Sequence, residues 1–168
     1  SIIKLGWNSN EGYKNNTYRT RYFEYLQNEK GWKSDILDEV KDSSLKVIRN
    51  IGNPNSSNSF FVRGMVLGSV QSGKTTNFNA VINSAIDIGY QLIIVFCGTI
   101  EDLRGQTFQR ISSDVIGGWE DDPLIRQRTG RNYKGVSNIY NFGPNEKQVN
   151  MITGPEKNGD FNADRKSV

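Results

Sequence analysis

The sequence predicts an α/β fold with a parallel sheet, preceded by a small helical region. Two continuous apolar runs, residues 60–67 (FFVRGMVL) and 91–98 (QLIIVFCG), have the composition of strands buried on both faces of a sheet. A glycine-rich loop and a segment with helical periodicity separate the two runs. Strand, loop, helix and strand in this order indicate a βαβ unit, in which the two strands lie parallel.

The glycine-rich loop, residues 68–76 (GSVQSGKTT), matches the pattern G-x-x-x-x-G-K-[ST] of a phosphate-binding loop. Small residues let its backbone N–H groups converge on a phosphate, and the positive end of the following helix points at the same anion. Lys74 is expected to contact the β- and γ-phosphates of ATP and Thr75 to bind Mg²⁺, so these are the predicted catalytic residues. The motif in this setting predicts a partial RecA-like P-loop NTPase lobe. The predicted nucleotide-binding residues are Gly68, Ser69, Val70, Gln71, Ser72, Gly73, Lys74, Thr75 and Thr76.

The segment after the loop has apolar residues on one face of a helix, and Gly89 has the place of a helix C-terminal glycine. The predicted buried face is Phe78, Val81, Ile82, Ala85 and Ile86. Upstream, residues 17–31 are predicted to form a helix that begins with Thr17 as its N-cap. This helix carries an aromatic stripe that we expect to be core rather than a platform for stacking bases. The stripe consists of Tyr18, Tyr22, Tyr25 and Leu26, with Phe23 beside it.

A second upstream helix is predicted for residues 35–51, with Ser34 as its N-cap. Its predicted buried side is Leu37, Val40, Ser44, Val47 and Ile51. Asp38 and Glu39 resemble the acidic end of a strand or a part of a nuclease site. Because they lie inside this helical pattern, we expect them to be ordinary surface or helix-packing residues.

After the second apolar run, residues 98–111 are predicted to form a helix with Thr99 as its N-cap. The predicted buried face of this helix is Ile100, Leu103, Thr107 and Ile111. Residues 147–154 are predicted to form a third short strand. The basic residues between positions 126 and 134 are typical of a solvated face, and a nucleic-acid contact is the alternative interpretation.

Composition narrows the class of protein. The 168 residues fit one domain, or a domain with a small appendage, and the net charge of +3 permits a nucleic-acid surface without requiring one. The absence of histidine removes His-based metal sites and Ser–His or Cys–His nucleophiles. Cys97 lies inside an apolar run and is expected to be a small core residue. No signal peptide or spanning apolar run is present, so we expect a cytoplasmic protein without a membrane partner.

A P-loop ATPase also needs an apolar strand that ends in an acidic residue, which holds the Mg²⁺ shell and orients the attacking water. After residue 98 no run of four apolar residues ends in Asp or Glu. Residues 114–117 match the D-x-x-G pattern of GTPases, but no apolar strand leads into them. We therefore expect this chain to be a fragment of a longer protein and to hydrolyse ATP negligibly by itself.

Residues 63–78 and 89–111 together resemble the Z-one domain, a P-loop ATPase family related to superfamily two helicases. The residues that carry the resemblance are the Val-Gln-Ser-Gly-Lys-Thr loop at 70–75 and the Leu-Arg-x-Gln-Thr helix at 103–107. The resemblance implies a bacterial restriction or phage-defence protein, often labelled an endonuclease, that works with nuclease, methyltransferase or other ATPase partners. No residue here supports the endonuclease label. In helicase-like proteins the second segment touches a nucleic-acid backbone, which makes Thr99, Arg104 and Gln106 candidate DNA contacts.

The predicted domains are a helical N-terminal region at 1–58, the partial P-loop lobe at 59–154 and a loop-like tail at 155–168. The predicted function is that of the ATP-binding N-terminal portion of a helicase-like ATPase that acts on DNA, with ATP and Mg²⁺ as its ligands. Two alternatives remain open. One is a small-molecule kinase or other P-loop phosphotransferase, for which the basic residues at 126–134 are the only hint. The other is a nucleotide-binding interaction module without hydrolysis.

Overall fold

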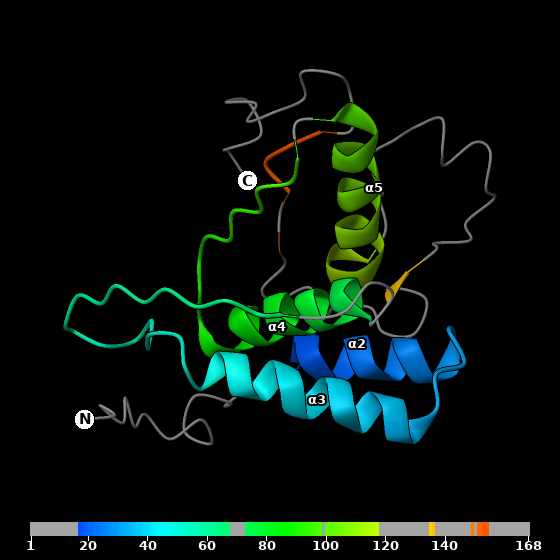
Figure 1. Cartoon of the computed structure of the whole chain (residues 1–168), viewed down its shortest axis with the longest axis horizontal. Helices are drawn as coiled ribbons and strands as arrows, with labels where there is room; N and C mark the ends of the chain where they lie inside the picture. Colours follow the sequence, from blue (N-terminus) through cyan, green and yellow to red (C-terminus); the bar gives the residue numbers. More distant parts are fainter. Residues whose placement is uncertain are drawn as a thin grey trace. The chain divides into compact units, whose positions relative to one another are not determined.

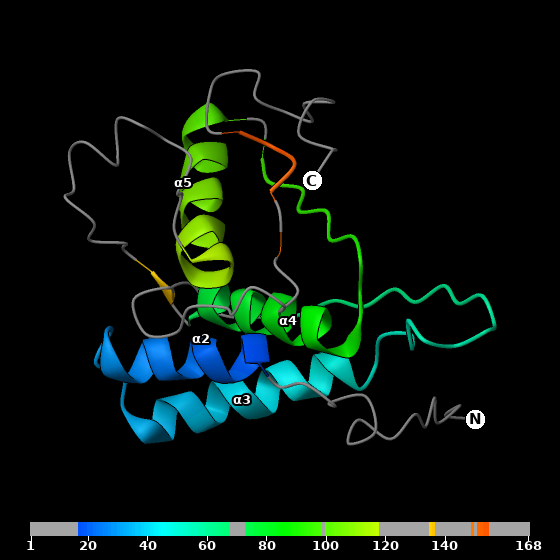
Figure 2. The ribbon, with the colours of Figure 1, turned by 180° about the vertical axis from the view of Figure 1, so that it is seen from behind.

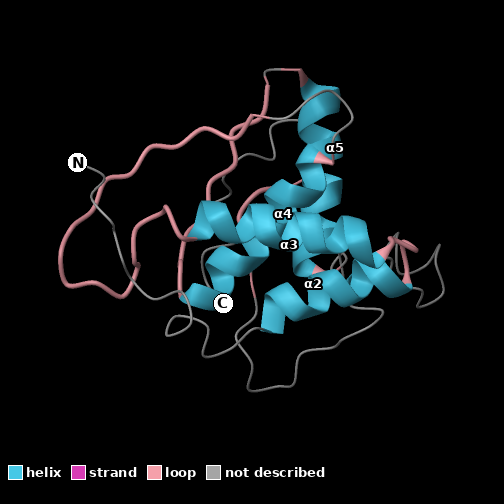
Figure 3. Cartoon of the chain, turned by 60° about the horizontal axis from the view of Figure 1, so that its bottom comes forward, coloured by secondary structure: helices cyan, strands magenta, loops and turns pink. Residues whose placement is uncertain are grey.

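The computed structural model describes residues 17–67, 73–98, 100–117, 135–136, 149 and 151–154. Across these ranges the chain contains helices and no strand (Figure 3). The chain divides into two compact units, Ser1–Ile93 and Ile94–Val168. The first unit contains α2 (Thr17–Asn28), α3 (Ser34–Ile48) and α4 (Lys74–Ile88), and the second contains α5 (Glu101–Ile111) and the π-helix η1 (Ser112–Ile116) (Figure 1).

The predicted α/β fold with a parallel sheet, a partial RecA-like lobe, is wrong for the described part of the chain. Residues 60–67 and 91–98 have no regular secondary structure and form no strand, and the described residues of 147–154 form none either. The two apolar runs lie at the surface, where Phe61 is 80% and Phe96 93% exposed. Apolar composition shows which residues can be buried, but a strand also needs a neighbour that pairs with its backbone N–H and C=O groups. Cys97, expected in the core, is exposed as well.

The core of the first unit forms where α4 packs against α2 and α3 (Figure 1 and Figure 2). Helix α4 runs from Lys74 to Ile88, and Gly89 follows it with φ 107°, which confirms the predicted helix and its C-terminal glycine. Phe78 was predicted to be buried, but it is 40% exposed. The apolar contact cluster consists of Ile48, Ala85 and Ile88, with Ile51, Val81 and Tyr90 packed against them.

Helix α2 places its aromatic stripe in the core, as the sequence predicts. The buried residues of the stripe are Tyr18, Tyr22, Phe23, Tyr25 and Leu26. The rings of Tyr22 and Phe23 lie 5.8 Å apart between centroids, in a tilted arrangement. Such aromatic burial contributes much of the apolar area that stabilises a small helical unit. The stripe is therefore core packing and not an exposed platform for bases.

Helix α3 begins at Ser34 and ends at Ile48. The N-cap position is occupied by Lys33, which makes no side-chain capping hydrogen bond, so the prediction that Ser34 is the N-cap is wrong. Leu37, Val40 and Ser44 are buried as predicted. The helix ends at Ile48 and does not extend to Ile51, which was predicted to belong to its buried side. Ile48 is instead the fully buried residue at this end of the helix.

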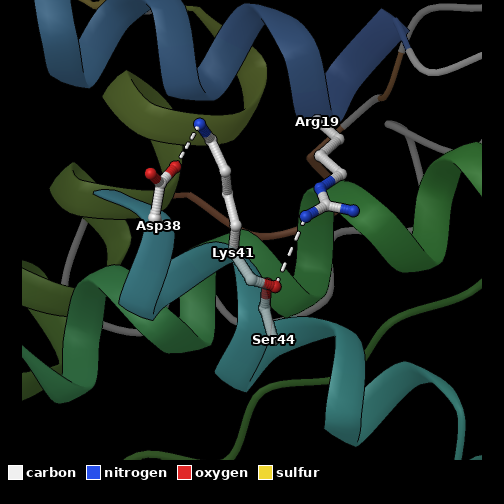
Figure 4. A network of polar contacts seen from close by, with 4 residues as sticks. All are labelled: Arg19, Asp38, Lys41 and Ser44. Carbon is white, nitrogen blue, oxygen red and sulfur yellow. Dashed lines mark hydrogen bonds and ion pairs between the residues drawn. The ribbon is translucent and has the colours of Figure 1, made fainter. Parts of the chain in front are cut away.

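A hydrogen bond joins α2 to α3, and two further polar contacts lie beside it within α3 (Figure 4). Arg19 Nη2 donates a hydrogen bond to the backbone carbonyl of Lys41 at 3.3 Å, and Ser44 Oγ donates to the same carbonyl at 3.0 Å. Lys41 Nζ forms an ion pair with Asp38 Oδ1 at 3.0 Å. Asp38 and its neighbour Glu39 are exposed, so they lie at the surface of a helix, where the sequence places them.

One side of α4 is polar. Asn79, Asn83 and Asp87 recur every four residues, so they share one side of the helix. Asn79 and Asn83 are fully buried, and the amide of Asn83 donates to the carbonyl of Asn79 at 2.9 Å. Asp87 contacts the N-terminus of α2. The hydrogen bonds of Asp87 therefore join this side of α4 to the start of α2.

Asp87 caps α2 from the neighbouring helix. Its Oδ1 accepts a hydrogen bond from the backbone N–H of Tyr18 at 2.9 Å, and its Oδ2 accepts one from Arg19 at 2.8 Å. Burial raises the pKa of Asp87 from 3.8 to about 6, although the two hydrogen bonds and the charges of Arg19 and Arg21 act in the opposite direction. A raised carboxyl pKa means that the folded chain holds the proton more tightly than the unfolded chain. The associated stability is present below about pH 4 and is lost as the pH rises through about 6.

We expect Asp87 to lower the free energy of unfolding by roughly 1–2 kcal/mol between about pH 4 and pH 7, a value reduced because the carboxyl is partly solvent-exposed. Asp87→Asn should remove this contribution to the pH slope. Urea denaturation followed by far-UV circular dichroism at several pH values measures how the free energy of unfolding depends on pH. An Asp87→Asn protein with the wild-type slope would contradict the assignment.

In the described part of the second unit, α5 leads into η1, whose C-terminal neighbour Gly117 has φ 116°. The predicted buried face of α5 is wrong at Ile100 and Leu103, which are 61% and 47% exposed, while Phe108 is buried. Ser112 Oγ donates to the sulfur of Met151 at 3.3 Å, which ties η1 to the segment 151–154. Among the described residues, no helix has the length and apolar character needed to cross a membrane.

Candidate phosphate-binding site

The candidate site is the N-terminus of α4. The helix begins at Lys74, and Gly73 precedes it in the left-handed conformation, with φ 71° and ψ 21°. Glycine adopts this conformation without the steric cost that a side chain would impose. The carbonyl of Gly73 accepts the first helical hydrogen bond, from the N–H of Asn77 at 3.0 Å. The residues G-K-T at 73–75 thus lie at a sharp entry into a helix, as the sequence predicts for the end of the loop.

The described residues of the predicted loop fit an anion. Lys74 is exposed, whereas Thr75 and Thr76 are half-buried. The helix dipole places partial positive charge at this end of α4, and the first turn contains no acidic residue that would repel a phosphate. This turn contains an ammonium group, hydroxyl groups and backbone N–H groups, the set that binds phosphate oxygens in proteins. Gly68, Ser69, Val70, Gln71 and Ser72 lie outside the described residues.

Two side chains from other helices hold the first turn of α4. Tyr22 Oη of α2 donates a hydrogen bond to the backbone carbonyl of Thr76 at 3.3 Å. Asn77 Nδ2 donates to Ser43 Oγ of α3. These contacts fix the start of α4 against both partner helices, so the position of Lys74 depends on the packing of the whole unit. The sequence assigns Tyr22 to the core only and gives Ser43 no role. Helical periodicity relates residues a few positions apart and cannot predict contacts between residues this distant in the sequence.

Trp32 lies beside Gly73. A methyl group on the α-carbon of Gly73 would come within 3.8 Å of Trp32 Cη2, and the Trp32 side chain is half-buried. Trp32 belongs to the connection between α2 and α3, and its backbone N–H donates to the carbonyl of Leu26 at 3.0 Å. Sequence reasoning did not assign a role to Trp32. No periodicity or motif relates a residue in a helix connection to a loop so far along the chain.

The predicted nucleic-acid contacts are not brought together. Thr99 lies outside the described residues, and Gln106 is exposed on α5. The guanidinium of Arg104 contacts Glu101 through Nε at 2.9 Å and Nη2 at 2.5 Å, and its Nη1 donates to the carbonyl of Gly154 at 3.0 Å. Arg104 and Gln106 are two positions apart, and residues at that spacing point to different sides of a helix. A DNA phosphate would have to displace the existing partners of Arg104.

Comparison with protein-family models, with curated proteins and with solved structures found no match to this chain. The geometry at the start of α4 and the sequence pattern around it are therefore the observations from which a function can be argued.

Proposed function

We propose that this chain binds a nucleoside triphosphate, ATP with Mg²⁺, at the loop 68–75 and the first turn of α4. The observation that carries the proposal is the coincidence of the G-x-x-x-x-G-K-[ST] pattern with a helix that starts at its lysine. Gly73 supplies the left-handed entry, Lys74 the charge and Thr75 the hydroxyl. The Thr75 hydroxyl is the group of this chain that would hold Mg²⁺, and the ion would neutralise phosphate charge.

The wider proposal is that the intact protein is an ATPase that acts on DNA in a bacterial restriction or defence system. It rests on the resemblance to the Z-one domain in residues 70–75 and 103–107. The small net charge of +3 gives it no further support, because it does not indicate a strongly basic surface. The nucleotide site stands independently of this wider proposal.

Isothermal titration of the chain with ATP, with and without excess Mg²⁺, tests the nucleotide site. We expect saturable binding that weakens at least severalfold when EDTA removes the metal, because the Thr75 hydroxyl then loses its partner and the phosphate charge is no longer neutralised. AMP, which lacks the β- and γ-phosphates, should bind far more weakly than ATP. Equal affinity for ATP and AMP, or no saturable binding of ATP, would refute the proposal.

A further inference from the structure

The connection between α2 and α3 holds its tryptophan at a fixed place. The backbone N–H groups of Glu29 and Lys30 donate to the carbonyl of Tyr25 at 3.0 and 3.2 Å, and that of Trp32 donates to Leu26 at 3.0 Å. Gly31 permits the turn with φ 67°. Because four consecutive residues of the connection are tied to α2 or restricted by the turn, the backbone of Trp32 is positioned by α2 and by this turn.

The indole lies against Gly73, the residue that precedes α4. Trp32 Cη2 is 3.8 Å from where a β-carbon on Gly73 would stand, and Trp32 is half-buried. Phe78, on the first turns of α4, is also partly exposed, but it lies one helical turn beyond Lys74 and therefore further from Gly73. Among the described residues, Trp32 is the aromatic side chain that comes within 4 Å of the β-carbon position of Gly73.

We propose that the indole of Trp32 is the surface on which the nucleotide base stacks, an inference that rests on the proposed nucleotide site. An anion held at the N-terminus of α4 leaves the rest of the ligand to extend along the neighbouring surface, and that surface carries an indole. Aromatic rings stack on any nucleobase, because every base presents a π-face, so this contact adds affinity with little discrimination between bases. The site then selects nucleotides over simple polyphosphates through Trp32.

The experiment compares two ligands on matched variants of the full chain. MgATP carries a base, whereas magnesium tripolyphosphate presents the phosphates alone. Trp32→Leu keeps an apolar side chain but removes the aromatic face. We expect this variant to lower the affinity for MgATP about five- to a hundredfold and to change the affinity for magnesium tripolyphosphate by less than about twofold. Trp32→Phe should retain most of the MgATP affinity, and Phe78→Leu, a nearby exposed aromatic, should bind both ligands like wild type.

The outcomes separate this inference from the proposed function. If Trp32→Leu weakens both ligands equally, Trp32 only supports Gly73, and the stacking assignment is overturned while the phosphate site stands. If Trp32→Leu binds MgATP like wild type, the stacking assignment is likewise overturned. If wild type binds neither ligand, the nucleotide site itself fails and the inference fails with it.

A second measurement does not depend on the folding of Trp32→Leu. The sequence has three tryptophans, so replacing Trp7 and Trp119 with phenylalanine leaves Trp32 as the single indole. Stacking predicts that MgATP changes the emission of Trp32 with the same midpoint as in the titration, and that tripolyphosphate does not. Emission that is unchanged by saturating MgATP would overturn the assignment.

Discussion

Lys74→Ala is expected to weaken the binding of MgATP by roughly thirtyfold to several thousandfold, since truncating one partner of a hydrogen-bonded charge pair costs about 2–5 kcal/mol. Lys74 is exposed at the first position of α4. Its removal leaves phosphate charge without its cation, while alanine is a good residue within a helix. The loss should therefore appear in ligand affinity and not in the stability of the unit.

Lys46→Ala is the matched control for this prediction. Lys46 is also an exposed lysine on a helix, but it lies in the last turn of α3, at the opposite end from the entry of that helix. Titration calorimetry with MgATP, with urea denaturation of the same preparations, measures affinity and folding together. If both variants lost affinity to the same small extent, the effect would be one of net charge, and the specific role of Lys74 would be refuted.

Ile48→Ala is expected to lower the free energy of unfolding by about 2–5 kcal/mol, the range for truncation of a buried aliphatic side chain. Ile48 is fully buried and packs with Ala85 and Ile88 of α4. Its truncation removes apolar area and leaves a cavity at the contact between α3 and α4. Because the first turn of α4 is held by contacts to α2 and α3, the same variant should also weaken MgATP binding near its unfolding midpoint.

Ile36→Ala provides the comparison for Ile48→Ala with identical chemistry. Ile36 lies on the same helix but is 44% exposed, so its truncation should change the free energy of unfolding by less than about 1 kcal/mol. Urea denaturation followed by far-UV circular dichroism gives both values. Equal losses in the two variants would show that α3 does not bury the face that contains Ile48.

The sequence by itself determined the helices of the first unit. Helical periodicity, the glycine after residue 88 and the entry at Lys74 are local features, and local geometry decides them. Gly73 is left-handed where the loop pattern requires a residue of low steric cost. The aromatic stripe of α2 is buried because its spacing matches one helical face. The surface position of Asp38 and Glu39 follows from their place in a helical pattern for the same reason.

Only the tertiary structure decided which apolar segments are covered and which side chains surround the start of α4. Residues 60–67 and 91–98 have the composition of strands, but a strand needs a partner that no local pattern specifies. In the described part of the chain both segments lie exposed and form no strand. The cap of α2 comes from Asp87 on α4, and Trp32 meets Gly73 across the unit. Such contacts join residues distant in the sequence, so they arise from packing and leave no periodic or motif signal to read.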